Sequence, residues 1–355
     1  MMAPIIPSGM YPPLPIADLD HVFNHTGELW ERLREKRIFI TGGTGFVGIW
    51  LLESFLHASE KLGLNAEALV LSRNPERFLK QLPHLANRRE LQFVAGDIRD
   101  FTFPDGSFSH TIHAAADVKG RCGGAFQEEV FDIITTGTQH LLSFLAQARP
   151  EQLLFVSSGA VYGPQPSHVP QIGESHHGAP DPLLPSSAYG LGKLAAEHLC
   201  AVHAARNRYE VKIARCFAFV GPHLPLNGGL AIGNFIRDGL QGGPICLLSD
   251  GKGVRSYLYA ADLAIWLWKI LFSGQSGRAY NVGSSSAISI GSLGRKIAKI
   301  CGVPAPVAVC GLPLTLPSTY VPNVERAETE LGLKEQISLD EALSRTLGWH
   351  RSRHS

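Results

Sequence analysis

Short apolar runs alternate with amphipathic runs along the first two thirds of the chain. Apolar β-type runs lie near residues 38, 67, 92, 110, 153 and 211, and stretches with helical periodicity separate them. This rhythm predicts βαβ units, because parallel strands need a crossover connection between them. The expected fold class is therefore α/β, with a doubly wound parallel sheet.

The first apolar run leads directly into a glycine-rich loop, Ile38-Phe-Ile-Thr-Gly-Gly-Thr-Gly-Phe-Val-Gly48. Gly42 permits a tight turn, Gly45 lets the backbone approach a pyrophosphate, and Gly48 lets the following helix pack closely on the strand. The unpaired amides at the start of that helix then face the anion. A dinucleotide is the expected ligand, and the loop residues expected to contact it are Gly42, Thr44, Gly45, Phe46, Val47 and Gly48.

The strand and helix rhythm breaks after about residue 216 into short pieces rich in glycine and proline. We therefore expect residues 37–215 to form a dinucleotide-binding domain and residues 216–355 to form mainly a substrate-binding lobe. The segment 251–273 is an apolar stretch that can return to the first domain. Residues 1–36 are expected to form an N-terminal extension, with a proline-rich arm followed by a charged helical run.

A tyrosine and a lysine lie four residues apart in Tyr189-Gly-Leu-Gly-Lys193, at the start of a helical run, and therefore share one helix face. A tyrosine hydroxyl titrates near pH ~10, so it is a poor base near neutrality unless a cation stabilises the phenolate, as Lys193 is placed to do. The run from Leu153 to Ser158 predicts a buried strand that ends in hydroxyl side chains. Catalytic groups of parallel sheets lie at the carboxyl ends of strands, so Ser158 is the third candidate.

Together, the TGxxGxxG loop, the serine-ended strand and the YxxxK pair resemble the extended short-chain dehydrogenase/reductase family, in particular its nucleotide-sugar epimerase/dehydratase branch. The resemblance covers about residues 37–332 and implies a Rossmann-type fold, an NAD(P) coenzyme and a nucleotide-sugar substrate. It implies that Tyr189 is the catalytic acid and base, with Lys193 and Ser158 as its partners. Tyr189 and Lys193 would also contact the coenzyme, and Ser158 the sugar. A homodimer formed through two helices, one near 126–148 and one after Tyr189, is a further implication.

Other matches to the family carry implied binding roles. Asp97 and Ile98 would lie beside the adenine ring of the coenzyme. Ala114 and Ala115 close another predicted strand, where small side chains would let the coenzyme lie against the backbone. Arg255 would hold the diphosphate of the sugar nucleotide through its bidentate fork.

The chain departs from the family at positions that decide the reaction. Dehydratases of this branch have Asp and Glu after the catalytic hydroxyl, and decarboxylases keep the Glu, whereas this chain has Gly159 and Ala160. Neither residue can move a proton, so hydride transfer with proton exchange at Tyr189 remains. The expected reaction is epimerisation, of the C4 type, of a nucleotide sugar through a transient keto intermediate. An NADPH-dependent keto-sugar reductase is the main alternative, ahead of a 4,6-dehydratase, a carbonyl reductase acting on non-nucleotide substrates, and a non-catalytic NADP sensor.

Three further departures lie at positions that often carry Asn, Asn and Arg in the family and carry Ile134, Ala218 and Tyr320 here. Substrate contacts therefore cannot all be inherited. At the end of the second strand, Ser72 and Arg73 stand where an NAD-specific site normally carries an acid for the ribose hydroxyls. An arginine there can meet a 2′-phosphate, which favours NADP(H), with NAD(H) as the alternative.

Composition agrees with a globular enzyme. A formal net charge of +1 across 355 residues gives no field that would attract nucleic acid. The apolar run Leu258 to Phe272 contains Asp262 and Lys269 and is too short to cross a bilayer, so we expect a core helix and no membrane partner. The N-terminus lacks the pattern of a signal peptide. The six cysteines form no CxxC pair, which favours a cytoplasmic, reducing location over a disulfide framework and gives no support for a metal site.

Overall fold

The computed structural model describes residues 9–116, 126–227, 229–303, 308–309 and 318–352. Its centre is a seven-stranded parallel sheet with the strand order β11-β6-β5-β4-β1-β2-β3. Each of the six predicted strands is present in this sheet, so the predicted fold class is confirmed. The seven strands are β1 (Arg37–Thr41), β2 (Glu67–Ser72), β3 (Leu91–Ala95), β4 (His110–His113), β5 (Gln152–Ser158), β6 (Glu210–Cys216) and β11 (Arg278–Val282).

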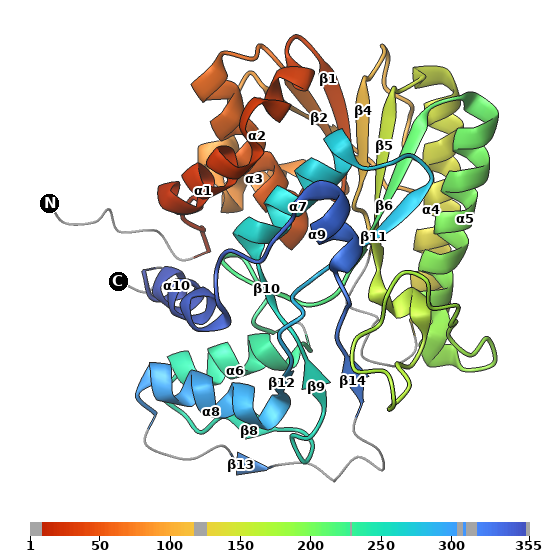
Figure 1. Cartoon of the computed structure of the whole chain (residues 1–355). Helices are drawn as coiled ribbons and strands as arrows, with labels where there is room; N and C mark the ends of the chain where they lie inside the picture. The colour runs from red at the N-terminus through yellow and green to blue at the C-terminus, as the bar shows by residue number, and fades with distance from the viewer. Residues whose placement is uncertain (1–8, 117–125, 228, 304–307, 310–317, 353–355) are drawn as a thin grey trace, which may run out of the picture.

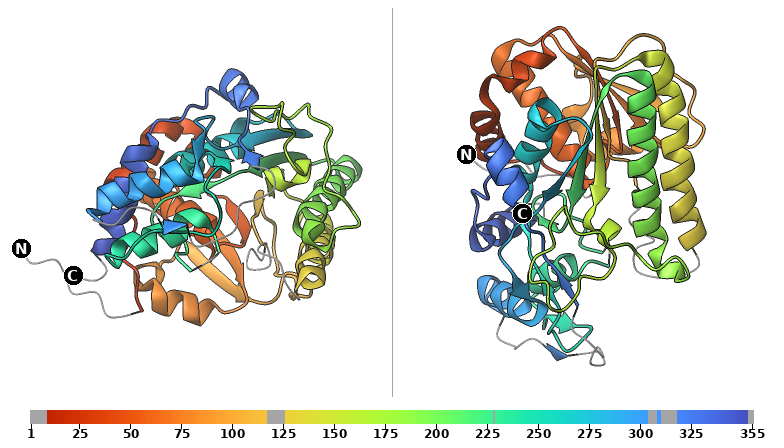
Figure 2. Two further views of the ribbon diagram at one scale, coloured as in Figure 1. Left: turned by 90° about the horizontal axis from the view of Figure 1, so that it is seen from below. Right: turned by 45° about the vertical axis from the view of Figure 1, so that its right-hand side comes forward.

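Helices cover both faces of the sheet (Figure 1). Helices α4 (Gln127–Ala148) and α5 (Ala188–Asn207) pack side by side on one face, and they stay together in both views of Figure 2. The other face carries α2 (Phe46–Leu62), α3 (Pro75–Gln81) and α7 (Ala260–Ser273). The alternation along a strand separates two apolar clusters, because Phe39 joins the cluster under α4 and α5 whereas Ile38 and Ile40 join the one under α2 and α7. A homodimer through α4 and α5 stays a prediction.

A smaller lobe lies at the end of the sheet where β5 and β6 finish (Figure 1). It contains α6 (Ala231–Leu240), α8 (Ile290–Cys301) and pairs or triplets of two-residue strands. These strands are β7 (Phe219–Val220), β8 (Cys246–Leu247), β9 (Val254–Arg255), β10 (Leu258–Tyr259), β12 (Ile288–Ser289), β13 (Ala308–Val309) and β14 (Thr319–Tyr320). The described chain also contains short 3-10 helices: η1 (Gly27–Leu33), η2 (Pro83–Leu85), η4 (Gly159–Tyr162) and η5 (Pro185–Ser187).

The chain returns to the sheet after part of the small lobe has been formed. Helix α7 is buried along nearly its whole length and packs against α2, and β11 then joins the edge of the sheet beside β6. The apolar run around α7 is therefore a core helix, and no helix among the described residues has the length and apolar character needed to span a membrane. Helices α9 (Glu325–Leu331) and α10 (Leu339–Arg351) follow. The boundaries of the two predicted domains stay a prediction.

The N-terminal extension packs on the body of the protein. Its helix α1 (Ile16–Thr26) lies against α2 and α7. Buried Asp18 accepts a hydrogen bond of 2.6 Å from the Tyr259 hydroxyl and also pairs with Arg345 of α10. On the same helix, His21 Nε2 lies 3.0 Å from the fully buried carboxylate of Asp262. The extension therefore ties α7 to the C-terminal helix.

The cysteines only partly match the expectation from their spacing. Cys200, Cys216 and Cys301 are not disulfide-bonded, whereas Cys246 in β8 takes part in a disulfide bond. The expected lack of disulfides therefore does not hold at Cys246. Spacing did not indicate this bond, because Cys246 has no CxxC partner in the sequence.

Candidate active site

The glycine loop between β1 and α2 has the conformation that its sequence predicts. Gly42 has a φ of 74°, and a Cβ atom placed there would lie 2.5 Å from backbone atoms of Ala114 and Ala115. A Cβ atom at Gly48 would lie 2.4 Å from the Gly42 carbonyl oxygen. Side chains are therefore excluded at both positions, and the loop lies directly against the end of β4.

The start of α2 is open toward this loop. Its N-cap is Gly45, and no side chain caps the first amides of the helix. The predicted contact residues Thr44, Phe46 and Val47 are partly accessible, and Gly45 is exposed. Uncapped amides and a backbone without side chains fit the pyrophosphate of a dinucleotide.

Two histidine bonds hold the end of β4 beside the glycine loop. His113 Nδ1 lies 2.7 Å from the Thr41 hydroxyl, and its Nε2 lies 3.0 Å from the Thr138 hydroxyl of α4. The Thr138 hydroxyl donates to the Ile134 carbonyl, so it accepts from His113 Nε2–H, and the Thr41 hydroxyl donates to Nδ1. Complete burial lowers the pKa of His113 to about 3, which keeps the ring neutral. The half-buried Ala114 and Ala115 follow this anchor.

The ends of β2 and β3 carry the predicted adenosine-binding residues. The buried Ser72 hydroxyl accepts a bond of 3.3 Å from the Asn74 amide, and Arg73 is exposed. Asp97 accepts two bonds from the Arg99 guanidinium, of 2.8 and 3.2 Å, and these hydrogen bonds lower the pKa of Asp97. Ile98 is buried and would contact a Cβ atom at Gly137 of α4. The structure therefore places the Ile98 side chain against α4.

The three predicted catalytic residues meet where β5 ends and α5 begins. Ser158 is the last residue of β5, and its hydroxyl accepts a bond of 3.2 Å from the Ala160 amide. Tyr189 lies in the first turn of α5, and Lys193 lies one turn later. A Cβ atom at Gly190 would lie 2.7 Å from the Ala160 carbonyl oxygen. The first turn of α5 is therefore in direct contact with the turn that follows Ser158.

The Lys193 ammonium is buried against β5. The side chain is 1% exposed, and its Nζ donates a bond of 2.8 Å to the Val156 carbonyl. Nζ also lies 4.7 Å from the centre of the Phe155 ring, a cation–π distance. This position is fixed by the packing of α5 on β5, which holds the cation at the carboxyl end of the sheet.

Phe217 packs beside Gly159, the residue that follows Ser158. It follows β6 directly and is 4% exposed. A Cβ atom at Gly159 would lie 2.6 to 2.8 Å from atoms of the Phe217 ring. An acidic side chain at position 159 would therefore have to displace this ring. The packing around Gly159 thus has no room for the acid that dehydratases carry at this position.

Arg255 lies in the small lobe, on β9. Its guanidinium donates to the Ser318 carbonyl at 2.8 Å and to the Ser318 hydroxyl at 3.0 Å. In the sheet β12-β9-β14, Arg255 is in register with Tyr320, whose ring centre lies 4.6 Å from that of Phe217. These contacts connect the predicted diphosphate anchor to the aromatic side chain beside Gly159.

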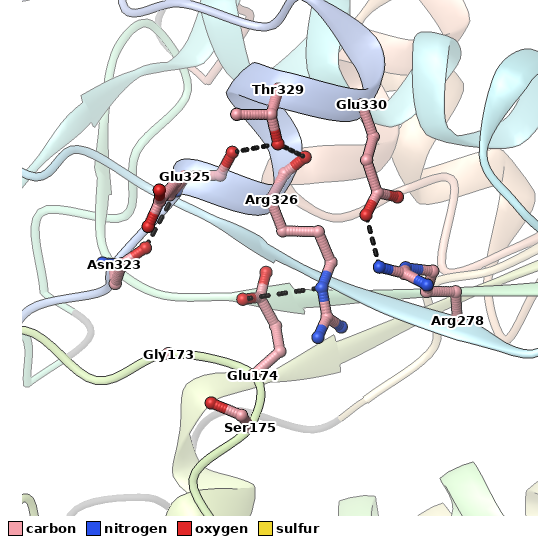
Figure 3. Close-up of a pocket in the computed structure, with 9 residues that line it drawn as sticks. All are labelled: Gly173, Glu174, Ser175, Arg278, Asn323, Glu325, Arg326, Thr329 and Glu330. Carbon is pink, nitrogen blue, oxygen red and sulfur yellow. Dashed lines mark hydrogen bonds and ion pairs between the residues drawn. The ribbon is translucent and has the colours of Figure 1, made fainter.

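The long connection formed by residues 163–187 packs on β11 and on the segment before α9. Ile172 exchanges backbone hydrogen bonds with Val321 and Asn323. A polar pocket of about 320 Å³ lies nearby, with Glu174, Arg278 and Arg326 among its lining residues (Figure 3). Figure 3 also shows the ion pair between Arg278 and Glu330, both of which line the pocket.

This pocket lies beside β11, which is separated from β5 by β6 in the sheet. Arg278 is in register with Lys212 of β6, and Lys212 is in register with Leu154 of β5, four residues before Ser158. Glu174, by contrast, accepts a bond of 2.8 Å from the Asn281 amide, and Asn281 is in register with Arg215, which pairs with Ser157. The pocket therefore extends along β11 toward the carboxyl end of the sheet. Within the described part of the chain, no group of three or more His, Cys, Asp or Glu side chains could hold a metal ion.

The family model described as "NAD dependent epimerase/dehydratase family" matches residues 38–283, which is more than half of the chain. The chain belongs to this family. The match begins at β1, includes the glycine loop, Ser158, Tyr189 and Lys193, and ends one residue after β11.

Sequence relatives of this family member include more than one activity. The UDP-glucose 4-epimerase of Yersinia pestis is 28% identical over 351 residues, covering 88% of this chain and 96% of the relative. UDP-glucuronic acid decarboxylase 1 of Xenopus tropicalis is 27% identical over 317 residues, covering 89% and 72%. These relatives therefore leave the reaction of this epimerase/dehydratase family member open.

Solved structures agree with the fold. An epimerase of Methanothermobacter thermautotrophicus aligns with a TM-score of 0.78 at 21% identity, over 94% of this chain and 98% of that chain. The protein MoeE5, solved in complex with UDP-glucose and NAD, aligns with a TM-score of 0.72 at 25% identity, over 90% and 100%. The seven-stranded parallel sheet of this family member matches Rossmann-type architecture in both cases.

The structure also brings residues to the site that the sequence did not single out. Glu197 lies one turn after Lys193 on α5, and Arg215 lies on β6 beside it. The four-residue spacing of Lys193 and Glu197 indicates that they share one face of α5. It does not indicate that Arg215 binds Glu197, because that contact depends on the position of β6 in the sheet. The sequence pattern also did not indicate the contact of Phe217 with Gly159, because these residues follow two different strands.

Proposed function

We propose that this protein epimerises a nucleoside-diphosphate sugar, at C4, through a transient keto intermediate. The proposal is carried by the absence of an acid after Ser158, where Gly159 packs against the Phe217 ring. Dehydration and decarboxylation in this family use acidic side chains at these positions, and Gly159 and Ala160 cannot replace them. Epimerisation requires removal and return of the proton on the hydroxyl oxygen and of the hydride on the carbon that bears it. Ser158, Tyr189 and Lys193 would serve the proton, and a bound nicotinamide coenzyme would serve the hydride.

The sugar hydroxyl would lie between Ser158 and Tyr189. Tyr189, as phenolate, takes the proton of the hydroxyl while the carbon loses its hydride, and it returns the proton when the opposite face of the keto group is reduced. Lys193 stabilises the phenolate by its positive charge. A bound nicotinamide supplies the acceptor and the donor of the hydride, and the uncapped start of α2 with Gly42 and Gly48 would hold its pyrophosphate.

Arg255 would bind the diphosphate of the substrate from the small lobe. A guanidinium fork matches two phosphate oxygens, and this contact is remote from the reacting carbon. The binding energy can then hold the sugar while the carbon changes configuration. The Ser318 hydroxyl accepts a hydrogen bond from the Arg255 guanidinium and would keep the guanidinium oriented.

The coenzyme is proposed to be NADP(H), with NAD(H) as the alternative. Ser72 and Arg73 stand at the end of β2, and neither carries the negative charge that would repel a 2′-phosphate. The same residues favour a second candidate function, an NADPH-dependent keto-sugar reductase. That reaction uses the same Ser158, Tyr189 and Lys193 but consumes the coenzyme.

The direct test is conversion of sugar nucleotides. The purified protein would be incubated with UDP- and dTDP-hexoses, and the products would be identified by nuclear magnetic resonance. We expect an equilibrium mixture of C4 epimers with no net oxidation or reduction of coenzyme. A product that has lost water or carbon dioxide would contradict the proposal.

A further inference from the structure

Two successive turns of α5 are attached to β5 through charged side chains. Lys193 donates to the Val156 carbonyl, and Glu197, one turn later, accepts a bond of 2.6 Å from the Ser157 hydroxyl. Val156, Ser157 and the catalytic Ser158 are consecutive residues. The contacts that hold α5 on the strand therefore adjoin the site itself.

Glu197 is also bound by an arginine from the neighbouring strand. The Arg215 guanidinium donates bonds of 3.0 and 2.7 Å to the two carboxylate oxygens, and the side chains are 16% and 7% exposed. Burial alone would lower the pKa of Arg215, but the bonds to Glu197 raise it above its ordinary value. The Arg215 guanidinium also lies 4.8 Å above the Tyr162 ring. The pair is nearly buried and bidentate, with Ser157 bonded to its carboxylate and the Tyr162 ring packed against its guanidinium.

The titratable groups around Lys193 differ in charge near neutral pH. His113 on β4 is neutral because burial lowers its pKa to about 3. Burial raises the pKa of Cys200 on α5 to about 12 and that of Tyr162 in the η4 turn to about 12, so both are neutral as well. Among these described groups, Lys193, Glu197 and Arg215 carry the charge.

The net charge of these three groups is +1. Lys193 and Arg215 contribute two positive charges and Glu197 contributes one negative charge. Without Arg215, the carboxylate would cancel the effect of the ammonium on nearby groups and attract it along the helix, since residues four apart face each other. In a nearly buried site, such charges act strongly over short distances.

We propose that the Arg215–Glu197 ion pair is a positioning device, which holds α5 on β5 and neutralises Glu197 so that the Lys193 charge acts on Tyr189. Arg215 and Glu197 act through Lys193 and contact neither substrate nor coenzyme. The consequence for turnover rests on the proposed function. The consequence for the titration of Tyr189 does not depend on any substrate.

Single substitutions of the two partners test the idea because they break the same bonds with opposite changes in charge. Glu197→Gln leaves a net charge of +2 and should lower the pKa of Tyr189, whereas Arg215→Gln leaves a net charge of zero and should raise it. We expect shifts of about one unit in each direction. The double variant should return close to the wild-type value.

The measurement is the ultraviolet absorbance of tyrosinate during a pH titration, with Tyr189→Phe in each background subtracted to isolate Tyr189. Shifts in the same direction, or no shift in either variant, would overturn the proposal, because loss of structure alone has no reason to depend on the sign of the charge. Should Arg215→Gln fail to fold, Arg215→Lys replaces it and should keep the wild-type value. Equal values for Glu197→Gln and Arg215→Lys would then overturn the proposal.

The titration also separates this inference from the proposed function. A wild-type protein that converts no sugar nucleotide would contradict the proposed reaction, while the tyrosinate titration would still decide the role of the ion pair. When turnover is present, the acid limb of its pH profile should move in the same direction as the titration of Tyr189.

Discussion

The sheet end with the glycine loop and the small lobe with Arg255 are built in different ways. Around the loop, the neighbouring strands β1 and β4 of the large sheet fix the backbone, as at Gly42, where a side chain would meet the backbone of Ala114 and Ala115. The small lobe contains strands of only two residues, joined by glycine- and proline-rich segments. Arg255 is held there by a single serine neighbour and its own strand. Sequence motifs can therefore specify the first region, whereas the second depends on contacts between distant segments.

The largest expected effect is at Tyr189. Tyr189→Phe removes the acid and base but keeps the ring, so turnover should fall about a thousandfold while dinucleotide binding persists. Turnover and coenzyme affinity measured on the same preparation check this. Tyr209→Phe is the matched control, because Tyr209 is equally buried but bonds to His203 at the far end of α5. Normal turnover in Tyr189→Phe would contradict the proposed mechanism.

The glycine loop gives the next largest effect. Gly42→Ala places a Cβ atom against the Ala114 and Ala115 backbone, so the loop must move and dinucleotide affinity should fall about a hundredfold. Gly63→Ala is the control, since Gly63 also has a positive φ but no atom lies within 4 Å of the added Cβ. That variant should lose about 1 kcal/mol of unfolding free energy and keep its affinity. Equal dinucleotide affinities for the two variants would contradict the prediction, because dinucleotide binding would then not depend on the contact of Gly42 with the end of β4.

Arg255 tests the small lobe. Arg255→Ala should raise the KM for the sugar nucleotide about tenfold to a hundredfold with little change in kcat, because it removes charge-assisted hydrogen bonds remote from the reacting carbon. Arg295→Ala, on the exposed side of α8, is the control and should leave KM unchanged. If both variants behave alike, the anchor lies elsewhere and the small lobe plays another part.

The smallest expected effect concerns coenzyme choice. Arg73→Ala should lower the preference for NADPH over NADH about tenfold, through loss of one charge-assisted bond to a 2′-phosphate. The control is Arg77→Ala, because Arg77 is also an exposed arginine but lies in α3, after the end of β2. Dissociation constants for both coenzymes would be measured for each variant. An unchanged ratio in Arg73→Ala would favour NAD(H) as the natural coenzyme.

The sequence supports the sheet and the loop more firmly than the substrate site, for physical reasons. The strands β1, β2 and β5 contain continuous apolar runs, and the turn at Gly42 has a local signature. β11 has the same parallel geometry, but it follows the small lobe, and its partner β6 lies more than 60 residues earlier. The Phe217–Gly159 contact and the Arg215–Glu197 pair likewise depend on strand register, which local patterns do not contain.

The most direct test of the account is to purify the protein without added coenzyme, denature it and identify the released dinucleotide by mass spectrometry. The proposed epimerase returns the hydride to the same sugar, so it should release close to one equivalent of NADP or NAD and should turn over without added coenzyme. An empty protein that oxidises NADPH in proportion to a keto sugar would contradict epimerisation and establish the reductase instead.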